Sequence, residues 1–125
     1  MDKKEALKIV KNRGTDIITL PEKFIKDREV VLEAVKNNGI SLFDATVDDK
    51  TFLKDREIVL EAVKSYGKAL IDADVDKSFL KDKEIVFAAL NSMHAMEAGV
   101  DYILDNIDES LQNDEDIRDW YEARY

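Results

Sequence analysis

The residues with the clearest potential for chemistry form one short acidic segment. Asp72-Ala73-Asp74-Val75-Asp76 places a carboxylate at every second position, as the first three ligand positions of a calcium-binding loop require. The segment then departs from that motif, because Lys77 stands where the sharp turn needs glycine and Lys83 stands where a bidentate glutamate is needed. Two lysines would oppose a divalent cation, so we predict no metal site. We expect these acids to be solvated and to cap a junction between structural units.

Catalytic residue types are scarce in the rest of the chain. His94 is the only histidine and there is no cysteine, which excludes a thiolate nucleophile, a disulfide and a zinc site built on a histidine pair. The sequence contains no glycine-rich phosphate loop and no Gly-x-Ser-x-Gly motif. We therefore predict no catalytic residue, no cofactor and no metal, and we interpret His94 as an ordinary surface or partly packed imidazole.

The residue types that favour protein binding gather toward the C-terminus. They are Trp120, Tyr121, Arg124, Met93 and Met96. Tryptophan, tyrosine and arginine dominate the energetics of protein interfaces, and the first three residues fall on one helical face. Methionine fills irregular space in a core and also serves in adaptable binding grooves. Two interpretations follow: the C-terminal helix covers the last open core surface and the methionines pack inside, or these residues bind a partner.

Charge and hydropathy define the class of partner. The chain has 19 Lys and Arg against 28 Asp and Glu, a formal net charge of −9, so we expect no nucleic acid partner. The N-terminus has no signal-peptide core and no stretch reaches membrane-spanning length. We expect a soluble, cytoplasmic protein without membrane contact, whose partner is another protein. The negative charge indicates either that this partner is basic or simply that the charge keeps the protein in solution.

A repeat organises the chain. Residues 24–36 recur 28 residues later at 52–64, and a third copy begins 27 residues after that at Phe79. A fainter copy at 2–14 matches 27–39, and the third unit carries about five extra residues between Leu90 and Gly99. At 125 residues, of which 45% are apolar, the chain is long enough for one domain with a modest core.

Each unit is typical of a long helix followed by a short one. In the first full copy Asp27 is placed to cap a helix, and Gly39 stands where a left-handed C-terminal stop would end it. Phe24, Phe52 and Phe79 each precede a long helix and are expected to fill the gap between successive units. Such short helices are marginal alone, so stacking must supply their burial. We predict an all-α fold, a short right-handed-type α-solenoid of tandem helix-turn-helix repeats with alternating long and short helices in about four to five units. The units are approximately 1–23, 24–51, 52–78 and 79–110, closed by a capping helix at 111–125.

The pattern Lys-Asp-Arg-Glu-Val-Val-Leu-x-Ala-Val-Lys-x-x-Gly-x-x-Leu-x-x-Ala at residues 26–45, with its second copy at 54–73, resembles the short bacterial repeats described as domain of unknown function 4116. The likeness is clear over residues 24–86 and weak at the ends. In that family the short helix usually continues into an aromatic-Ala-Ser-Glu-Glu-Leu segment, which Asp44-Ala45-Thr46-Val47-Asp48 and 72–76 replace here. The resemblance implies helical repeats and supplies no catalytic residue.

Three functions compete on these grounds. The first is a non-enzymatic protein-interaction or scaffold module, because stacked helical units create extended surfaces. The second is a ligand-binding protein or enzyme whose acids converge at repeat junctions; the residues named for it are Asp44, Asp72, Asp74 and Asp76, together with His94. The third is an acidic mimic of nucleic acid, which only the net charge suggests.

Overall fold

The described part of the chain is entirely helical. The computed structural model describes residues 1–92 and 97–125, and within these ranges every regular element is a helix and no strand occurs. The prediction of an all-α protein is confirmed at this level. None of the helices in the described ranges is long and apolar enough to cross a bilayer.

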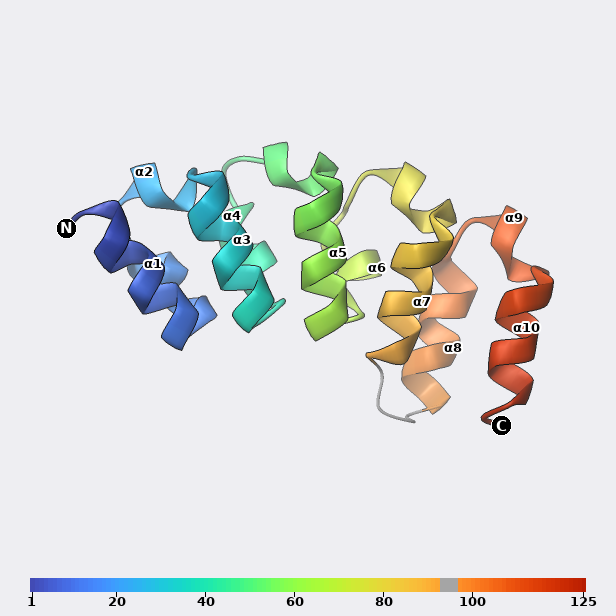
Figure 1. Cartoon of the computed structure of the whole chain (residues 1–125). Helices are drawn as coiled ribbons and strands as arrows, with labels where there is room; N and C mark the ends of the chain where they lie inside the picture. Colours follow the sequence, from blue (N-terminus) through green and yellow to red (C-terminus); the bar gives the residue numbers. More distant parts are fainter. Residues whose placement is uncertain (93–96) are drawn as a thin grey trace.

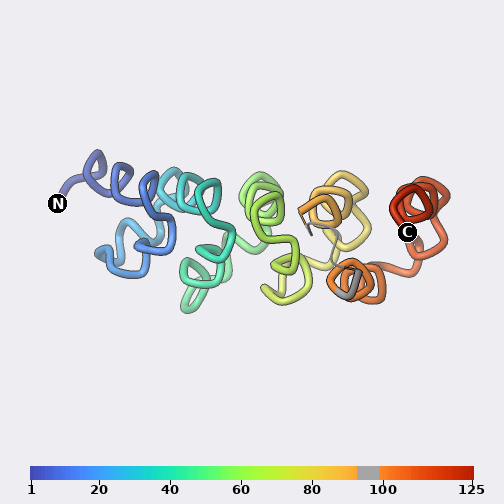
Figure 2. The backbone as a smooth tube through the Cα atoms, turned by 90° about the horizontal axis from the view of Figure 1, so that it is seen from below, coloured from blue at the N-terminus to red at the C-terminus, as the bar shows by residue number. Residues whose placement is uncertain are grey.

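Four long helices lie side by side in a row (Figure 1). They are α1 (Lys3–Asn12), α3 (Arg28–Asn37), α5 (Arg56–Ser65) and α7 (Lys83–Asn91). Each packs on the next one, α1 on α3, α3 on α5 and α5 on α7. The view from below shows that the row is elongated and that the two termini lie at its opposite ends (Figure 2).

Short helices follow the first three members of the row: η1 (Gly14–Thr19), α4 (Ser41–Ala45) and α6 (Ala69–Asp72). The helix that comes after α7 in the chain, α8 (Glu97–Asn106), has ten residues and is as long as the helices of the row, so the predicted alternation of long and short helices does not hold in the unit 79–110. A second short element then precedes the next long helix. In the three repeated copies this short element contains the phenylalanine, Phe24, Phe52 or Phe79. These elements are α2 (Glu22–Ile25), η2 (Thr51–Lys54) and η3 (Lys77–Lys81), with α9 (Glu109–Gln112) before the last helix, α10 (Glu115–Glu122). The two-helix unit expected from the sequence lacked this additional turn.

One apolar core runs along the row. Phe24, Phe52 and Phe79 are buried, as predicted, and pack in the same cluster as the apolar stripes of the long helices. In α3 that stripe is Val30, Val31, Ala34 and Val35, and the equivalent residues of α5 are equally buried. No helix of ten residues could persist by itself in water, so burial between neighbours stabilises each one.

Aspartates begin most of the long helices. Asp27 accepts hydrogen bonds from the backbone N–H groups of Glu29 and Val30, and Asp55 accepts one from Ile58. These side chains satisfy N–H groups that have no partner inside the helix. Both N-caps were predicted. Asp2 and Asp82 cap the other two long helices, Asp114 caps α10, and Asp76 and Asp108 cap the short elements η3 and α9.

The prediction that Gly39 ends its helix in the left-handed conformation is wrong. No glycine of the described residues has a positive φ, so the glycines do not act as left-handed stops. Gly39 instead permits a close approach, because a β-carbon there would lie 2.2 Å from the carbonyl oxygen of Ala62. The same contact recurs where Gly14 meets Ala34 and Gly67 meets Ala89. Glycine is therefore required by the packing of consecutive helices.

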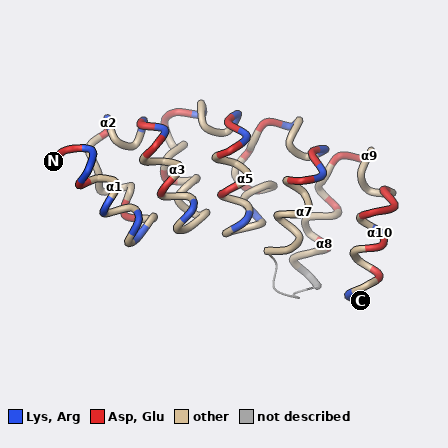
Figure 3. The backbone as a smooth tube through the Cα atoms, in the orientation of Figure 1, with Lys and Arg blue, Asp and Glu red and all other residues tan. Residues whose placement is uncertain are grey.

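Ion pairs connect the N-terminal ends of successive long helices; we call this series the N-terminal ladder. In each step a basic residue at the start of one long helix pairs with two acids of the next long helix, or of α10 after α7. The first acid is the N-cap aspartate of that helix, and the second lies two positions later. For example, Nε of Arg28 lies 2.6 Å from Oδ2 of Asp55, and Nη2 of Arg28 lies 2.7 Å from Oε1 of Glu57. The remaining steps are Lys3 with Asp27 and Glu29, Arg56 with Asp82 and Glu84, and Lys83 with Asp114 and Asp116. Basic and acidic residues accordingly mix along this edge of the row (Figure 3).

Candidate functional site: an open groove at the first junction

The predicted binding residues of the C-terminal helix turn toward their own chain. The indole N–H of Trp120 donates to Oδ1 of Asn91 at 2.9 Å, and the ring is half-buried against the core. The guanidinium of Arg124 lies 4.1 Å from the centre of that ring and is exposed. Tyr121 is half-buried, and its hydroxyl lies 3.4 Å from Asp101 of α8. The three residues do lie together, in an arrangement that covers the end of the row. Whether they bind a partner remains a prediction.

Three predicted residues fall outside the described part of the chain. Met93 and Met96, named as binding residues, and His94, named with the acids of the alternative site, lie in the segment 93–96.

Two acids of the calcium-like segment, Asp72 and Asp76, accept hydrogen bonds within the protein. Asp76 caps η3 by accepting from the backbone N–H and hydroxyl of Ser78, and these bonds lower the pKa of its carboxyl group. Asp72 accepts a hydrogen bond from the hydroxyl of Tyr102, and Asp74 adopts a φ of 56°. Within the described ranges no group of three or more His, Cys, Asp or Glu residues is arranged to hold a metal ion.

We number the junctions between units by the short elements that they join: the first lies between α2 and η2, the second between η2 and η3, and the third between η3 and α9. The second and third junctions are closed by the same two contacts, a buried aliphatic side chain and a backbone hydrogen bond. At the second junction the backbone N–H of Asp76 donates to the carbonyl of Leu53 at 3.0 Å, and the preceding residue, Val75, is only 6% exposed. At the third junction Asp108 N–H donates to the carbonyl of Leu80 at 3.1 Å, and Ile107 is 4% exposed. One aliphatic side chain and one backbone bond therefore fill each of these junctions.

The first junction lacks both parts of that device. Neither Asp48 nor Asp49 donates a backbone bond to the carbonyl of Ile25, the residue equivalent to Leu53, and Val47 is 70% exposed. The first full unit also differs from the second in length. Twenty-eight residues separate Phe24 from Phe52, against 27 between the next two phenylalanines, and the extra residue falls in the segment 47–49. In this segment Val47 is exposed, whereas Val75 of the second unit is buried, and a space remains beside it.

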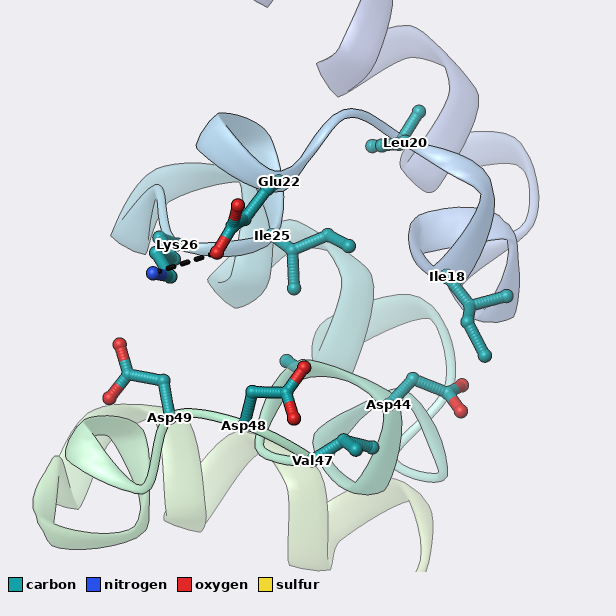
Figure 4. Close-up of a pocket in the computed structure, with 10 residues that line it drawn as sticks. Ile18, Leu20, Glu22, Ile25, Lys26, Asp44, Val47, Asp48 and Asp49 are labelled. Atoms are coloured by element: carbon teal, nitrogen blue, oxygen red, sulfur yellow. Dashed lines mark ion pairs between the residues drawn. The ribbon is translucent and has the colours of Figure 1, made fainter.

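The space is a groove of about 440 Å³ (Figure 4), which we call the junction groove. Its apolar surface comes from η1, α2 and their connection on one side and from α4 and the segment after it on the other; the residues are Ile18, Leu20, Ile25, Ala45 and Val47. Ile18 is 60% exposed, so the apolar surface continues outside the groove. The volume is within the range of about 300–1,000 Å³ that is typical of ligand pockets.

The rim of the junction groove is acidic. Asp44, Asp48 and Asp49 line one side, as the close-up shows, whereas the cation of the opposite side, Lys26, is paired with Glu22 at 3.0 Å (Figure 4). The Glu22 carboxylate raises the pKa of Lys26, so this lysine remains charged and engaged.

The three aspartates are not equivalent. Thr51 donates two bonds to Asp49 and lowers the pKa of its carboxyl group. Asp44 and Asp48 accept no hydrogen bond from the described residues, and partial burial raises the pKa of Asp44. A site with an apolar floor and two acids without hydrogen-bond partners fits a ligand that is both aliphatic and basic.

Sequence reasoning named one residue of this groove, Asp44, but placed it in a site shared with the acids of the next unit. The structure separates them, because Asp44 lines the first junction and Asp76 caps a helix at the second. The groove itself was missed. The available signal was the unequal repeat length, 28 residues in the first full unit and 27 in the second.

These features define an all-helical protein whose helices recur with the sequence repeat. The chain belongs to the family described as Domain of unknown function (DUF4116), whose model matches residues 2–48 and 55–93. The resemblance seen in the repeated pattern is thereby confirmed, and the match extends nearer the N-terminus than that pattern did. No curated protein and no solved structure matches the chain.

Proposed function

We propose that this protein is a non-enzymatic protein-interaction module, a short right-handed α-solenoid whose units follow the boundaries given by the repeat. The junction groove is its binding site. One observation carries the proposal: a junction that is closed twice by the same device is left open at its first occurrence, with apolar and acidic side chains exposed around it. Exposed apolar surface rimmed by polar residues is typical of interaction sites.

The shape of the row supports this role. Each long helix packs on its neighbours, so the row is held by local contacts and leaves a long surface accessible. Stacked helical repeats use such surfaces to bind other proteins. The sign of the net charge, −9, favours a partner with basic residues.

Crosslinking inside cells of the natural host tests the proposal. A photoactivatable phenylalanine analogue is placed at Val47 on the groove and, in a matched variant, at Lys36 on the exposed surface of α3. We expect a discrete protein adduct from position 47 that is absent from position 36 and is lost when Asp44→Lys is added. Adducts of equal pattern from both positions, or none from position 47, would overturn the proposal.

A further inference from the structure

The two closed junctions show what fills such a space in this fold. At the second junction the occupant is the irregular segment around Val75, which inserts one aliphatic side chain and donates the Asp76 N–H to a carbonyl of the preceding unit. Ile107 and Asp108 repeat this at the third junction, although the chain there has a different length. The requirement is therefore a short, non-helical stretch that buries one aliphatic residue.

The first junction offers the complementary surface without the occupant. Ile25 stands at the place of Leu53 and lines the junction groove, and no backbone N–H of the segment 47–49 is bonded to its carbonyl. Leu20 and Ala45 add apolar surface. An incoming chain could supply the side chain and the N–H that the segment 47–49 does not.

The charge of the rim selects the residues that flank the inserted side chain. Asp44 and Asp48 lie on the groove without hydrogen-bond partners in the described residues. The lysine on the opposite side, Lys26, is ion-paired with Glu22 and also interacts electrostatically with Asp48 and Asp49, so it has little charge left for a ligand. A flanking lysine or arginine would gain charge-assisted bonds there, and a flanking acid would be repelled.

We propose that the junction groove binds a short, non-helical segment of a partner protein in which one aliphatic residue is flanked by lysine or arginine. The segment completes the first junction as Val75 and Asp76 complete the second: its aliphatic side chain packs on Leu20 and Ile25, its backbone N–H bonds to the Ile25 carbonyl, and its cations face Asp44 and Asp48. This inference rests on the proposed function and specifies the partner for the same groove.

A peptide array tests the partner chemistry on the full chain. The array holds acetylated and amidated hexapeptides with a central Val, Ile or Leu flanked by Lys or Arg, and matched sets with Glu flanks or with Gly at the centre. We expect the Lys- and Arg-flanked aliphatic peptides to bind and both matched sets to bind roughly tenfold more weakly or less. Equal binding of the Glu-flanked set would overturn the proposal.

Variants of the protein locate the binding. Asp44→Lys and Asp48→Lys should each weaken the positive peptides about tenfold, whereas Asp119→Lys, the same charge change on the exposed surface of α10, should leave binding unchanged. Deletion of Asp48 restores the 27-residue spacing, so we expect it to close the groove and abolish binding while circular dichroism retains the helical signal. Binding that survives the deletion in a folded protein, or that responds equally to Asp119→Lys, would overturn the assignment.

The crosslinking and peptide experiments separate the two levels of the proposal. A specific adduct from position 47, together with peptides that show no preference for basic flanks, refutes the partner chemistry and leaves the interaction role standing. If position 47 gives no specific adduct and the peptides show no preference for basic flanks, both the interaction role and the partner chemistry are refuted. An increase in sedimentation coefficient at high protein concentration, reversed by Asp44→Lys, would instead identify a second copy of the chain as the occupant and overturn this inference.

Discussion

The backbone of Gly39 lies so close to Ala62 of the next long helix that a β-carbon on the glycine would come within 2.2 Å of the alanine carbonyl oxygen. The backbone N–H of the same glycine donates to the hydroxyl of Ser65 at 2.8 Å. Gly14 has the corresponding relationship with Ala34, and its N–H donates to the side chain of Asn37 at 2.6 Å. Tight contact and a hydrogen bond thus join consecutive units at the ends of their long helices.

Gly39→Ala should therefore destabilise the protein, because the added methyl group must separate α3 from α5 or shift the backbone. Overpacking of a tight interior site costs roughly 1–3 kcal/mol. Urea unfolding at neutral pH measures the change in free energy. Lys36→Ala in the same helix is the control and should stay within about 0.5 kcal/mol of wild type, as exposed substitutions do. A Gly39→Ala variant as stable as that control would show that the contact can relax.

The N-terminal ladder predicts a stability that depends on acid. Arg56 donates two hydrogen bonds to the carboxylate of Asp82 and so holds the pKa of that group below its ordinary value. A depressed pKa means that the ionised aspartate stabilises the folded state above the unfolded pKa, and that this contribution is lost as the pH falls through the folded pKa.

Two substitutions of Asp82 separate its charge from its capping bond. Asp82→Asn removes the charge but retains an N-cap acceptor, so it should lower stability modestly at pH 7, and the difference from wild type should shrink as the pH falls through the folded pKa and the aspartate becomes protonated. Asp82→Ala also removes the cap of α7 and should cost about 1 kcal/mol more than Asp82→Asn. Thermal unfolding of the three proteins across this pH range measures both effects. A deficit of Asp82→Asn that persists in acid would contradict the ion-pair explanation.

The repeat in the sequence was sufficient to predict the long helices and their order, but not the additional short element that precedes α3, α5 and α7. Caps at Asp27 and Asp55 and burial of Phe52 follow from local patterns that any two-helix unit would impose. The conformation of Gly39 was not predictable in the same way, because the pattern of a left-handed stop and that of a close contact both call for glycine. The distinction depends on the distance to Ala62, a residue 23 positions later.

The junction groove was less accessible to sequence reasoning. A single additional residue between Val47 and Asp49 changes no hydropathy pattern, and the sequence does not reveal whether the segment that contains it fills the junction. The acids attracted attention by their spacing, whereas their roles depend on partners from other segments, such as Tyr102 for Asp72. The ladder was missed for the same reason, since the charges of a helix surface that pair with a neighbouring unit look identical to solvated ones.

Trp120 provides a test of the two interpretations of the C-terminal helix. Its indole N–H bonds to Asn91 at the end of α7, and its ring is half-buried in the core. Trp120→Ala should lower the free energy of unfolding by about 1–3 kcal/mol, whereas the exposed Arg124→Ala should change it by less than about 0.5 kcal/mol. If the helix only covers the end of the row, adducts from position 47 should persist in both variants. Unchanged stability with loss of adducts would favour the interpretation of Trp120 as a binding residue.

Asp44 predicts a pH dependence opposite in sign to that of Asp82. Burial in the wall of the junction groove raises the pKa of Asp44, so the folded state disfavours its charged form. Stability is therefore lost as the pH rises from the unfolded pKa through the folded pKa, and the loss remains above it. Asp44→Asn removes this penalty, so it should raise the Tm at pH 7 and leave it unchanged at about pH 3.

A bound basic peptide should reverse this effect, because a cation beside Asp44 favours the carboxylate and lowers its pKa. Peptide binding at a pH between the two values must then release a proton from the free protein. The carboxyl carbon of Asp44, followed by NMR during a pH titration with and without a Lys-flanked valine peptide, measures both pKa values directly. The free protein should titrate above the ordinary value for aspartate and the complex below that of the free protein. A titration of Asp44 that the peptide leaves unchanged would mean that the cations of the ligand lie elsewhere, and would separate Asp44 from the binding site even if the groove itself is occupied.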